Sequence, residues 1–328
     1  MFMPGSTGTN KVLGQKSAGI ETDKLVGNWI PGTGIVNTAS STEWGAGVPN
    51  YWQNQVSGGK HLRVYNCEAA DMMGVSTPPY HIAPETNEYV GEASTNYGGS
   101  PFQIITERNW AVSVWLRTPQ DSPTTRTNGV FSICNAGDQP NLAIESNGSS
   151  SYGADQFGDD TYYRIKFNGN GVADQDRYVL IPDYITAFGS GKSPNWFNLT
   201  VIATGTSRTT GNPTHTSHLI ILINGSVFYY ETGTDWAPSG SSGPLTVGGA
   251  AFGSSSGNLT SYLASGWMIG HIHVYQPSTS SHTDYPCLTV SKARQNYHAI
   301  AETYKSVANH RHYGETSYGK FFPYYNTD

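Results

Sequence analysis

The hydrophobic pattern is clearest at residues 218–230, with the sequence HLIILINGSVFYY. Residues 219–223 form a run of aliphatic side chains, and residues 226–230 are rich in β-branched and aromatic ones. The Asn224-Gly225 pair between the two runs is typical of a type I′ turn, because Asn and Gly adopt positive φ at the lowest cost. The pattern therefore predicts a β-hairpin.

A two-residue turn also fixes the register of the hairpin. It predicts that Ile223 pairs with Ser226 and that Ile221 pairs with Phe228. The first strand is apolar on both faces, so we expect it inside a sheet rather than at an edge.

Short segments with strand character recur from about Lys60 to Tyr275, separated by Gly, Ser, Asn and Asp. In residues 109–117 the apolar side chains alternate with a period of two, which places Trp110 and three aliphatic residues on one face. We expect Trp110 and Trp196 to lie in the core. Further predicted strands are residues 61–66, 103–107, 129–134, 141–145, 162–167, 178–181, 195–203, 245–248 and 266–275. Many short strands with regular turns predict a sandwich or a barrel.

One helix is predicted near the end of the chain, from Val290 to about Ala308. Thr289 precedes it and is a suitable N-cap. Its apolar face is expected to consist of the residues at helical spacing, namely Ala293, Tyr297, Ile300 and Tyr304.

Composition supports an all-β protein, since only 13% of the 328 residues are charged while 12% are aromatic and 38 are Gly. The net charge of −6 and the lack of a basic patch argue against nucleic acid as a partner. No stretch is long and apolar enough for a membrane span, and the N-terminus lacks the apolar region of a signal peptide. We expect synthesis in a cytoplasm.

The two ends of the chain differ from the middle. Residues 1–59 and 310–328 carry several aromatic side chains but no hydrophobic period from which to build a core. We therefore expect an extended N-terminal arm, a domain over residues 60–309, and an aromatic C-terminal tail. We expect the sandwich to be complete without the arms, which are expected to bury their rings against it or against another subunit.

The order of the strand motifs resembles that of laminin-G-like, concanavalin A-like jelly-roll domains over roughly residues 60–305. The shared features are strands that carry a Trp, a strand ending in Asn-Gly, a Leu-x-Val-Gly strand, and a helix that starts with Leu-Thr. The matching positions are Trp115, Trp196, Asn224-Gly225, Leu245-Thr246-Val247-Gly248, Gly266, Ile269, Val274-Tyr275, Leu288-Thr289 and Asn296-Tyr297. The chain departs from the family at Lys292, where Glu is common. The resemblance implies an antiparallel jelly-roll sandwich with one short C-terminal helix.

The resemblance does not give an activity, because this fold serves many functions. Glycosidases of the fold carry a Glu-x-Asp-x-(x)-Glu strand, whose carboxylates act as nucleophile and acid. The nearest match, Glu21-Thr22-Asp23, lacks the third carboxylate and lies outside the predicted strands. We expect no enzyme activity.

Two groups of side chains could bind a metal. Acidic residues cluster in two loops beside the strand at residues 162–167, and oxygen ligands on loops suit Ca²⁺. These calcium candidates are Asp155, Asp159, Asp160, Asp174 and Asp176. His271 and His273 alternate on one strand, and His310 and His312 repeat the spacing. Solvated turn aspartates and structural histidines are the alternatives that we favour. Apart from Ca²⁺ in the aspartate loops, we expect no cofactor.

The helix ending Gln295-Asn296-Tyr297, the arms and the Ser/Thr/Asn/Gly-rich composition resemble virion proteins of tailed bacteriophages. The resemblance implies a structural protein of the virion, either a capsid decoration or a capsid-fibre subunit, with other virion proteins and further copies of itself as partners. The alternative is a lectin-like module that binds a host surface glycan, as at a tail-fibre tip or in a receptor-binding protein.

Overall fold

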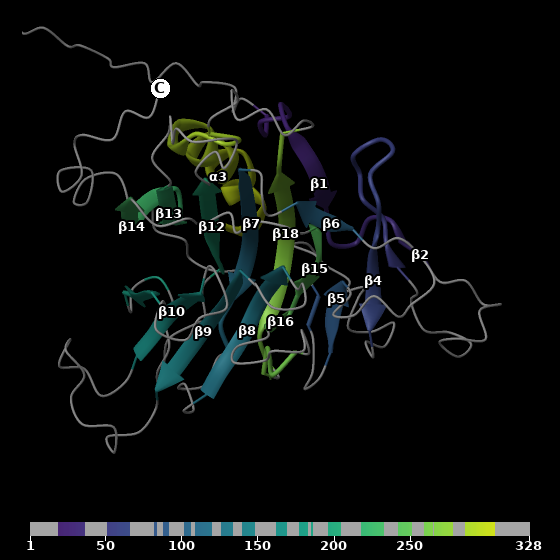
Figure 1. Cartoon of the computed structure of the whole chain (residues 1–328). Helices are drawn as coiled ribbons and strands as arrows, with labels where there is room; N and C mark the ends of the chain where they lie inside the picture. Colours follow the sequence, from purple (N-terminus) through teal and green to yellow (C-terminus); the bar gives the residue numbers. More distant parts are fainter. Residues whose placement is uncertain are drawn as a thin grey trace, which may run out of the picture.

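The chain folds into a sandwich of two antiparallel β-sheets with one helix against the outer face of one sheet (Figure 1). The computed structural model describes residues 19–36, 51–65, 82–83, 88–91, 102–105, 109–119, 126–133, 140–147, 162–168, 177–182, 185, 196–204, 218–232, 242–250, 259–264, 266–277 and 286–305. This architecture confirms the expected all-β, antiparallel jelly-roll sandwich with one C-terminal helix. Within the described part of the chain, no helix has the length and apolar character needed to cross a membrane.

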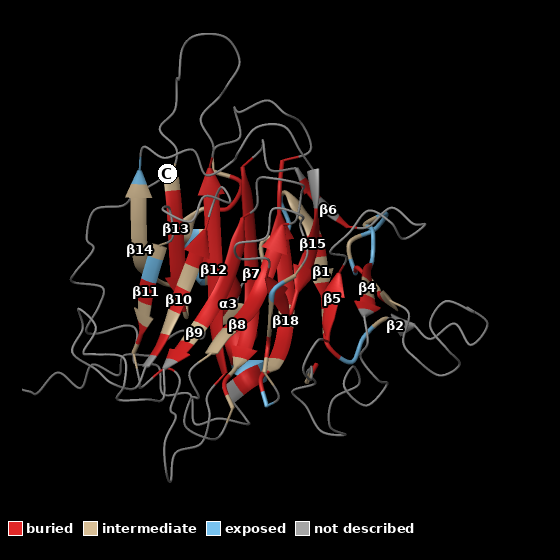
Figure 2. Cartoon of the chain, turned by 60° about the horizontal axis from the view of Figure 1, so that its bottom comes forward, coloured by how far each residue is buried: buried red, intermediate tan, exposed pale blue. Residues whose placement is uncertain are grey.

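The first sheet has six strands in the order β1-β18-β7-β12-β13-β14. Their bounds are β1 Leu25–Trp29, β18 Met268–Tyr275, β7 Trp110–Arg117, β12 Trp196–Thr204, β13 His218–Ile223 and β14 Ser226–Thr232. Figure 2 shows that its central strands are almost entirely buried, while β14 at the edge is only partly so. These central strands are packed on both faces, which explains their long apolar runs.

The second sheet has ten strands, nine of them in the order β11-β10-β9-β8-β15-β5-β4-β3-β2, with β6 beside β15. Their bounds are β11 Arg177–Ile181, β10 Tyr162–Asn168, β9 Asn141–Asn147, β8 Arg126–Ile133, β15 Ser242–Val247, β5 Tyr89–Gly91, β4 Leu62–Tyr65, β3 Tyr51–Trp52, β2 Ile35–Val36 and β6 Gln103–Ile105. A small hairpin of β16 (Gly249–Ala250) and β17 (Ser261–Tyr262) packs on β8.

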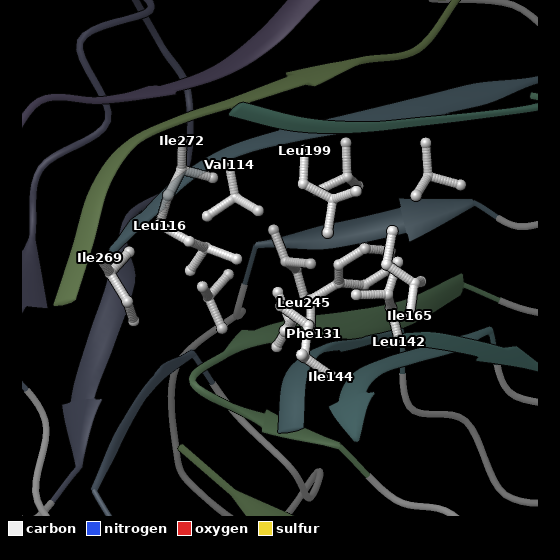
Figure 3. Close-up of a cluster of buried hydrophobic side chains, with 14 of the residues drawn as sticks. Val114, Leu116, Phe131, Leu142, Ile144, Ile165, Leu199, Leu245, Ile269 and Ile272 are labelled. Atoms are coloured by element: carbon white, nitrogen blue, oxygen red, sulfur yellow. The ribbon is translucent and has the colours of Figure 1, made fainter. Parts of the chain in front are cut away.

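The main core lies between the two sheets (Figure 3). Val114 and Leu116 of β7 point across to residues such as Phe131 and Leu142 of the other sheet. Trp110 is fully buried here and meets Phe131 edge-on, with ring centroids 6.3 Å apart. The period of two in residues 109–117 therefore predicted the inward face of β7 correctly.

The N-terminal region contributes strands to this sandwich, which corrects the expectation that the strands begin near Lys60. Leu25–Trp29 forms β1, which pairs with β18 and completes one edge of the six-stranded sheet. Trp29 and Trp52 are both fully buried in the main core. The region has no hydrophobic period, because each of its short edge strands buries only one or two side chains. The division of the chain at residue 60 stays a prediction.

The predicted hairpin is present, with one difference in register. Asn224 and Gly225 have φ of 51° and 74°, as a type I′ turn requires, and Ile223 pairs with Ser226. Ile221 pairs with Tyr229 and not with Phe228, because the register shifts between Ile221 and Leu222. A β-bulge adds one residue to β14 and lets both Phe228 and Tyr229 pack against the main core.

Helix α3, Val290–Lys305, covers the outer face of the six-stranded sheet. Thr289 caps its N-terminus, since its Oγ1 accepts a hydrogen bond from the Lys292 amide at 3.2 Å. Trp196 is buried, but in the layer between this sheet and α3 rather than in the sandwich interior. Trp196 starts β12 with its side chain toward the helix, while its neighbour Phe197 faces the main core.

Candidate functional site

The residues singled out as metal ligands are only partly described. Asp155, Asp159, Asp160, Asp174, Asp176, His310 and His312 all lie outside the described residues. Among the residues that the structure describes, no three His, Cys, Asp or Glu side chains are grouped so that they could hold a metal ion. A calcium site in the aspartate loops stays a prediction.

His271 and His273 lie side by side beneath α3, with ring centroids 6.1 Å apart. The hydroxyl of Tyr304 accepts a hydrogen bond from the His271 amide at 2.8 Å, and it lies 2.7 Å from Nδ1 of the same residue. The hydroxyl oxygen can accept a second hydrogen bond or donate its proton, so the direction of the contact with Nδ1 follows the tautomer of His271. His273 is fully buried.

Burial keeps both imidazoles neutral. It lowers the pKa of His271 to about 4. The pKa of His273 falls to about 3, mainly through burial and also through its neighbour His271. Charged imidazolium is disfavoured in such a layer. The two histidines therefore fit a structural role beneath the helix.

A buried polar network continues this layer. Asn198 Nδ2 donates to Ser113 Oγ at 3.0 Å, and Thr200 Oγ1 donates to the same oxygen at 2.9 Å. All three side chains are at most 3% exposed. These three side chains are thus buried and hydrogen-bonded to one another.

The outer face of the ten-stranded sheet has a different character at β9, β10 and β11. Tyr163, Ile165 and Phe167 of β10 point into the main core, so Arg164 and Lys166 point outward. In the paired strands, Glu145 lies opposite Arg164 and Tyr178 lies opposite Lys166. We call these four residues the β9–β11 patch.

The β9–β11 patch combines one aromatic ring with three charges. Arg164 donates from Nε and Nη2 to Oε2 of Glu145, both at 2.8 Å, while Lys166 Nζ lies 3.6 Å from Oε1. The Arg164 guanidinium also lies 4.3 Å from the centre of the Tyr178 ring. Among the large hydrophobic side chains whose burial the structure describes, only Tyr178 is exposed, at 36%.

A second set of contacts fixes the strand that carries Tyr178. Arg177, the preceding residue, donates to Glu231 Oε1 of β14 at 2.8 Å, and the Tyr229 hydroxyl also bonds to Glu231. These contacts join the edge strand β11 of one sheet to the edge strand β14 of the other. Burial and the Glu231 hydrogen bond both raise the pKa of Tyr229, and the Glu231 hydrogen bond raises that of Arg177. This pair of strands therefore holds Tyr178 on a stiff edge.

The β9–β11 patch was not identified from the sequence. Residues 162–167 were predicted as a strand, and their alternation already separates Arg164 and Lys166 from the aromatic positions. The sequence pattern does not give the pairing that brings Tyr178 and Glu145, which lies 19 positions before Arg164, beside them. The three strands are consecutive and pair in chain order, but the register that sets these side chains opposite one another is not encoded in the local pattern.

Comparison with known proteins identifies a fold likeness only. No protein-family model matches the chain, and no curated protein matches it. The receptor-binding domain of botulinum neurotoxin C/D mosaic serotype is 9% identical with a TM-score of 0.48, and the comparison covers 84% of this chain and 51% of that one. The binding domain of botulinum neurotoxin DC in complex with rat synaptotagmin II is 10% identical with a TM-score of 0.46, covering 85% and 52%. This chain therefore spans about half of those chains, and at these values the likeness says nothing of function.

Proposed function

We propose that the protein is a non-enzymatic glycan-binding module, and that it binds its ligand on the β9–β11 patch. The observation that carries the proposal is Tyr178, an exposed ring on a stiff sheet edge beside two cations and a carboxylate. An exposed apolar surface rimmed by polar groups is typical of a binding site.

The chemistry of the β9–β11 patch matches that of a sugar. The apolar C–H face of a pyranose packs on an aromatic ring, which is amphipathic and loses little entropy when held. Its hydroxyls bond to charged donors and acceptors, and such bonds are stronger than neutral ones. Arg164, Lys166 and Glu145 supply both kinds of group on a single face.

Stability does not account for this set of residues. Partly exposed ion pairs contribute about 0–1 kcal/mol to folding. An exposed Tyr at an edge strand adds little to the core, and a plain polar side chain would keep the edge soluble. A binding role explains why the four residues of the β9–β11 patch occur together, whereas packing does not.

The test is a glycan array followed by calorimetric titration of the best ligand. We expect Tyr178→Ala to weaken binding by at least tenfold, since stacking is lost, and Tyr178→Phe to keep most of it. Arg164→Ala should weaken binding through lost hydrogen bonds, worth about 1.5–3 kcal/mol to a charged group.

The matched control for Arg164→Ala is Arg294→Ala, which removes an exposed arginine from α3 on the other side of the sandwich. It should bind like the wild type. An array without any ligand, or equal affinities for the wild type and Tyr178→Ala, would overturn the proposal.

The virion interpretation stays a prediction, together with virion partners and a homo-oligomer. It rests on the two arms, the composition and the Gln295-Asn296-Tyr297 ending. That ending also has a local role here, because Gln295 Nε2 donates to the Gly19 carbonyl at 2.7 Å and Asn296 Nδ2 to the Tyr275 hydroxyl at 2.9 Å. A glycan-binding module could also serve on a particle, and an image of particles labelled on this chain would decide that question.

A further inference from the structure

Arg117, the last residue of β7, is a cation set into a mostly apolar layer. Its neighbour Leu116 points into the main core (Figure 3), so Arg117 points to the outer face of the six-stranded sheet. There its cross-strand neighbours are Met268 of β18 and Trp196 of β12. Both neighbours pack in the aromatic cluster beneath α3, and Arg117 itself is half-buried. The side chain therefore carries its charge into surroundings that solvate a cation poorly.

The guanidinium of Arg117 has a single polar contact to the described residues, and that contact is weak. Its Nη1 lies 3.3 Å from the Sδ of Met268, and a thioether is a poor acceptor. Its Nε is buried and has no hydrogen-bond partner among the described residues. None of the ion pairs between described residues includes Arg117. Burial lowers the pKa of Arg117, as expected for a cation without an anion beside it.

A buried donor of a charged group that has no acceptor is rare in a folded protein. A charge is costly to take out of water unless it is paired, and an unsatisfied buried group calls for a cause such as strain, a functional role or a bound molecule. The same face of the sheet satisfies other polar groups from within, since Asn198 and Thr200 both donate to Ser113. The partner of Arg117 is therefore to be sought outside the described residues.

The open side of the guanidinium defines the group that it can hold. Nη1 is turned to Met268, so Nε and Nη2 form the side that has no hydrogen bond to the described residues. These two donors form a planar fork that matches the two oxygens of a carboxylate. A carboxylate also brings one negative charge to one positive charge, whereas sulfate would bring a second charge into a poorly solvating layer.

We propose that Arg117 holds the carboxylate of an organic monoacid, at a site flanked by Met268 and Trp196 on the outer face of the six-stranded sheet. The β9–β11 patch faces outward from the other sheet of the sandwich. The two sites are therefore separate, and either proposal can fail without the other. The acid can be a small free molecule or the acidic unit of a sugar, because both present the same group to the fork.

The test uses the full chain with acetate, propionate and glucuronate as probes, each exchanged for chloride at constant ionic strength. We expect each acid to raise the melting temperature of the wild type, because a ligand that binds only the folded chain stabilises it. Sulfate should raise it less. In nuclear magnetic resonance, the signal of the Arg117 Nε–H should move as the acid is added. Tighter binding of propionate than of glucuronate identifies a small organic acid as the ligand, and the reverse order identifies a sugar acid.

The variants separate the fork from the charge. Arg117→Met should lose the response to acids and melt no lower than the wild type in chloride, because it removes a charge that is costly to bury. Arg117→Lys should bind acids about tenfold more weakly, since it keeps the charge without the fork. Arg294→Met removes an exposed arginine of α3 and should keep the full response. If the Arg117 variants do not fold, the Nε–H signal of the wild type still decides.

Four results would each overturn the proposal. The acids would act elsewhere if they raised the melting temperatures of the wild type and Arg117→Met equally. The fork would bind no carboxylate if neither the melt nor the Nε–H signal responded. The chain itself would fill the fork if only Asp121→Asn, four positions further on and outside the described residues, moved that signal. Sulfate binding as tight as that of the acids would contradict a carboxylate ligand.

Discussion

At the scale of single residues, His271 and His273 determine how the protein responds to acid. The pKa of each imidazole is lower in the folded chain than the unfolded value of about 6.5. The unfolded state therefore binds more protons in this range, and stability falls as the pH drops below about 6.5 toward the folded values. For His273 alone, the loss reaches about 2 kcal/mol at pH 5.

We expect the free energy of unfolding to decrease between pH 7 and pH 5, and His273→Leu to flatten that dependence. Chemical denaturation at several pH values measures both. The pKa of Glu21 is lowered chiefly by Lys292, so this residue adds to the loss of stability only at pH values near and below the ordinary pKa of a glutamate. His271 keeps its own contribution in this variant. An unchanged slope would mean that His273 is not kept neutral by the fold.

The loop aspartates give a second expectation at this scale. If Asp155, Asp159, Asp160, Asp174 and Asp176 include calcium ligands, a chelator should lower the melting temperature and added Ca²⁺ should restore it. Mg²⁺ at the same concentration serves as the control, because its smaller octahedral site fits such loops poorly. A melt that does not change with chelation supports solvated turn aspartates.

At the scale of elements, Lys292 shows why a helix must be seen in its surroundings. Lys292 occupies the position three residues after the Thr289 cap, where Glu would complete a capping box. In the structure its Nζ lies 2.9 Å from Oε2 of Glu21, in the segment that precedes β1. Sequence rules therefore favour Lys292→Glu, whereas the fold opposes it.

We expect Lys292→Glu to lower stability by about 0.5–1.5 kcal/mol, through the loss of this pair and repulsion from Glu21. The double variant Glu21→Lys, Lys292→Glu should recover part of the loss. Thermal unfolding of the three chains measures the coupling. A rise in melting temperature for Lys292→Glu would show that the capping box outweighs the pair.

Local patterns predicted the elements well and their arrangement poorly. Alternation placed the inward face of β7, and Asn224-Gly225 gave the hairpin turn with its first pair. The bulge in β14 was not predicted, because it depends on the packing of both Phe228 and Tyr229 against the core. Strand β1 was not predicted, because five residues with one buried Trp show too little periodicity. The β9–β11 patch needs the register of three consecutive strands, which the loops between them do not reveal in the sequence.

At the scale of the whole molecule, the N-terminal region is part of the sandwich. Deletion of residues 1–55 would remove β1, β2 and β3 together with Trp29 and Trp52. Loss of one buried Trp costs about 3–5 kcal/mol, so two exceed much of the stability of an ordinary domain. We expect the chain 56–328 not to fold, which reverses the expectation that the sandwich is complete without this region.

Circular dichroism and thermal melting of the truncated chain measure this effect. Deletion of residues 1–18 is the control, because it leaves every described residue in place. That shorter deletion should melt within a few degrees of the full chain. Cooperative unfolding of chain 56–328 at the same temperature would mean that β1 is dispensable.

The pairing of β1 with β18 also determines how long β1 stays unpaired during synthesis. Leu25 lies opposite Tyr275, so 250 residues must be made before this strand can find its partner. At about 5–20 residues per second on a ribosome, the wait is roughly 12–50 s. During that interval the unpaired edge and the ring of Trp29 are open to other nascent chains, and contacts so distant in sequence form slowly even afterwards. Slower growth at low temperature should therefore raise the soluble yield by leaving fewer waiting chains to meet one another.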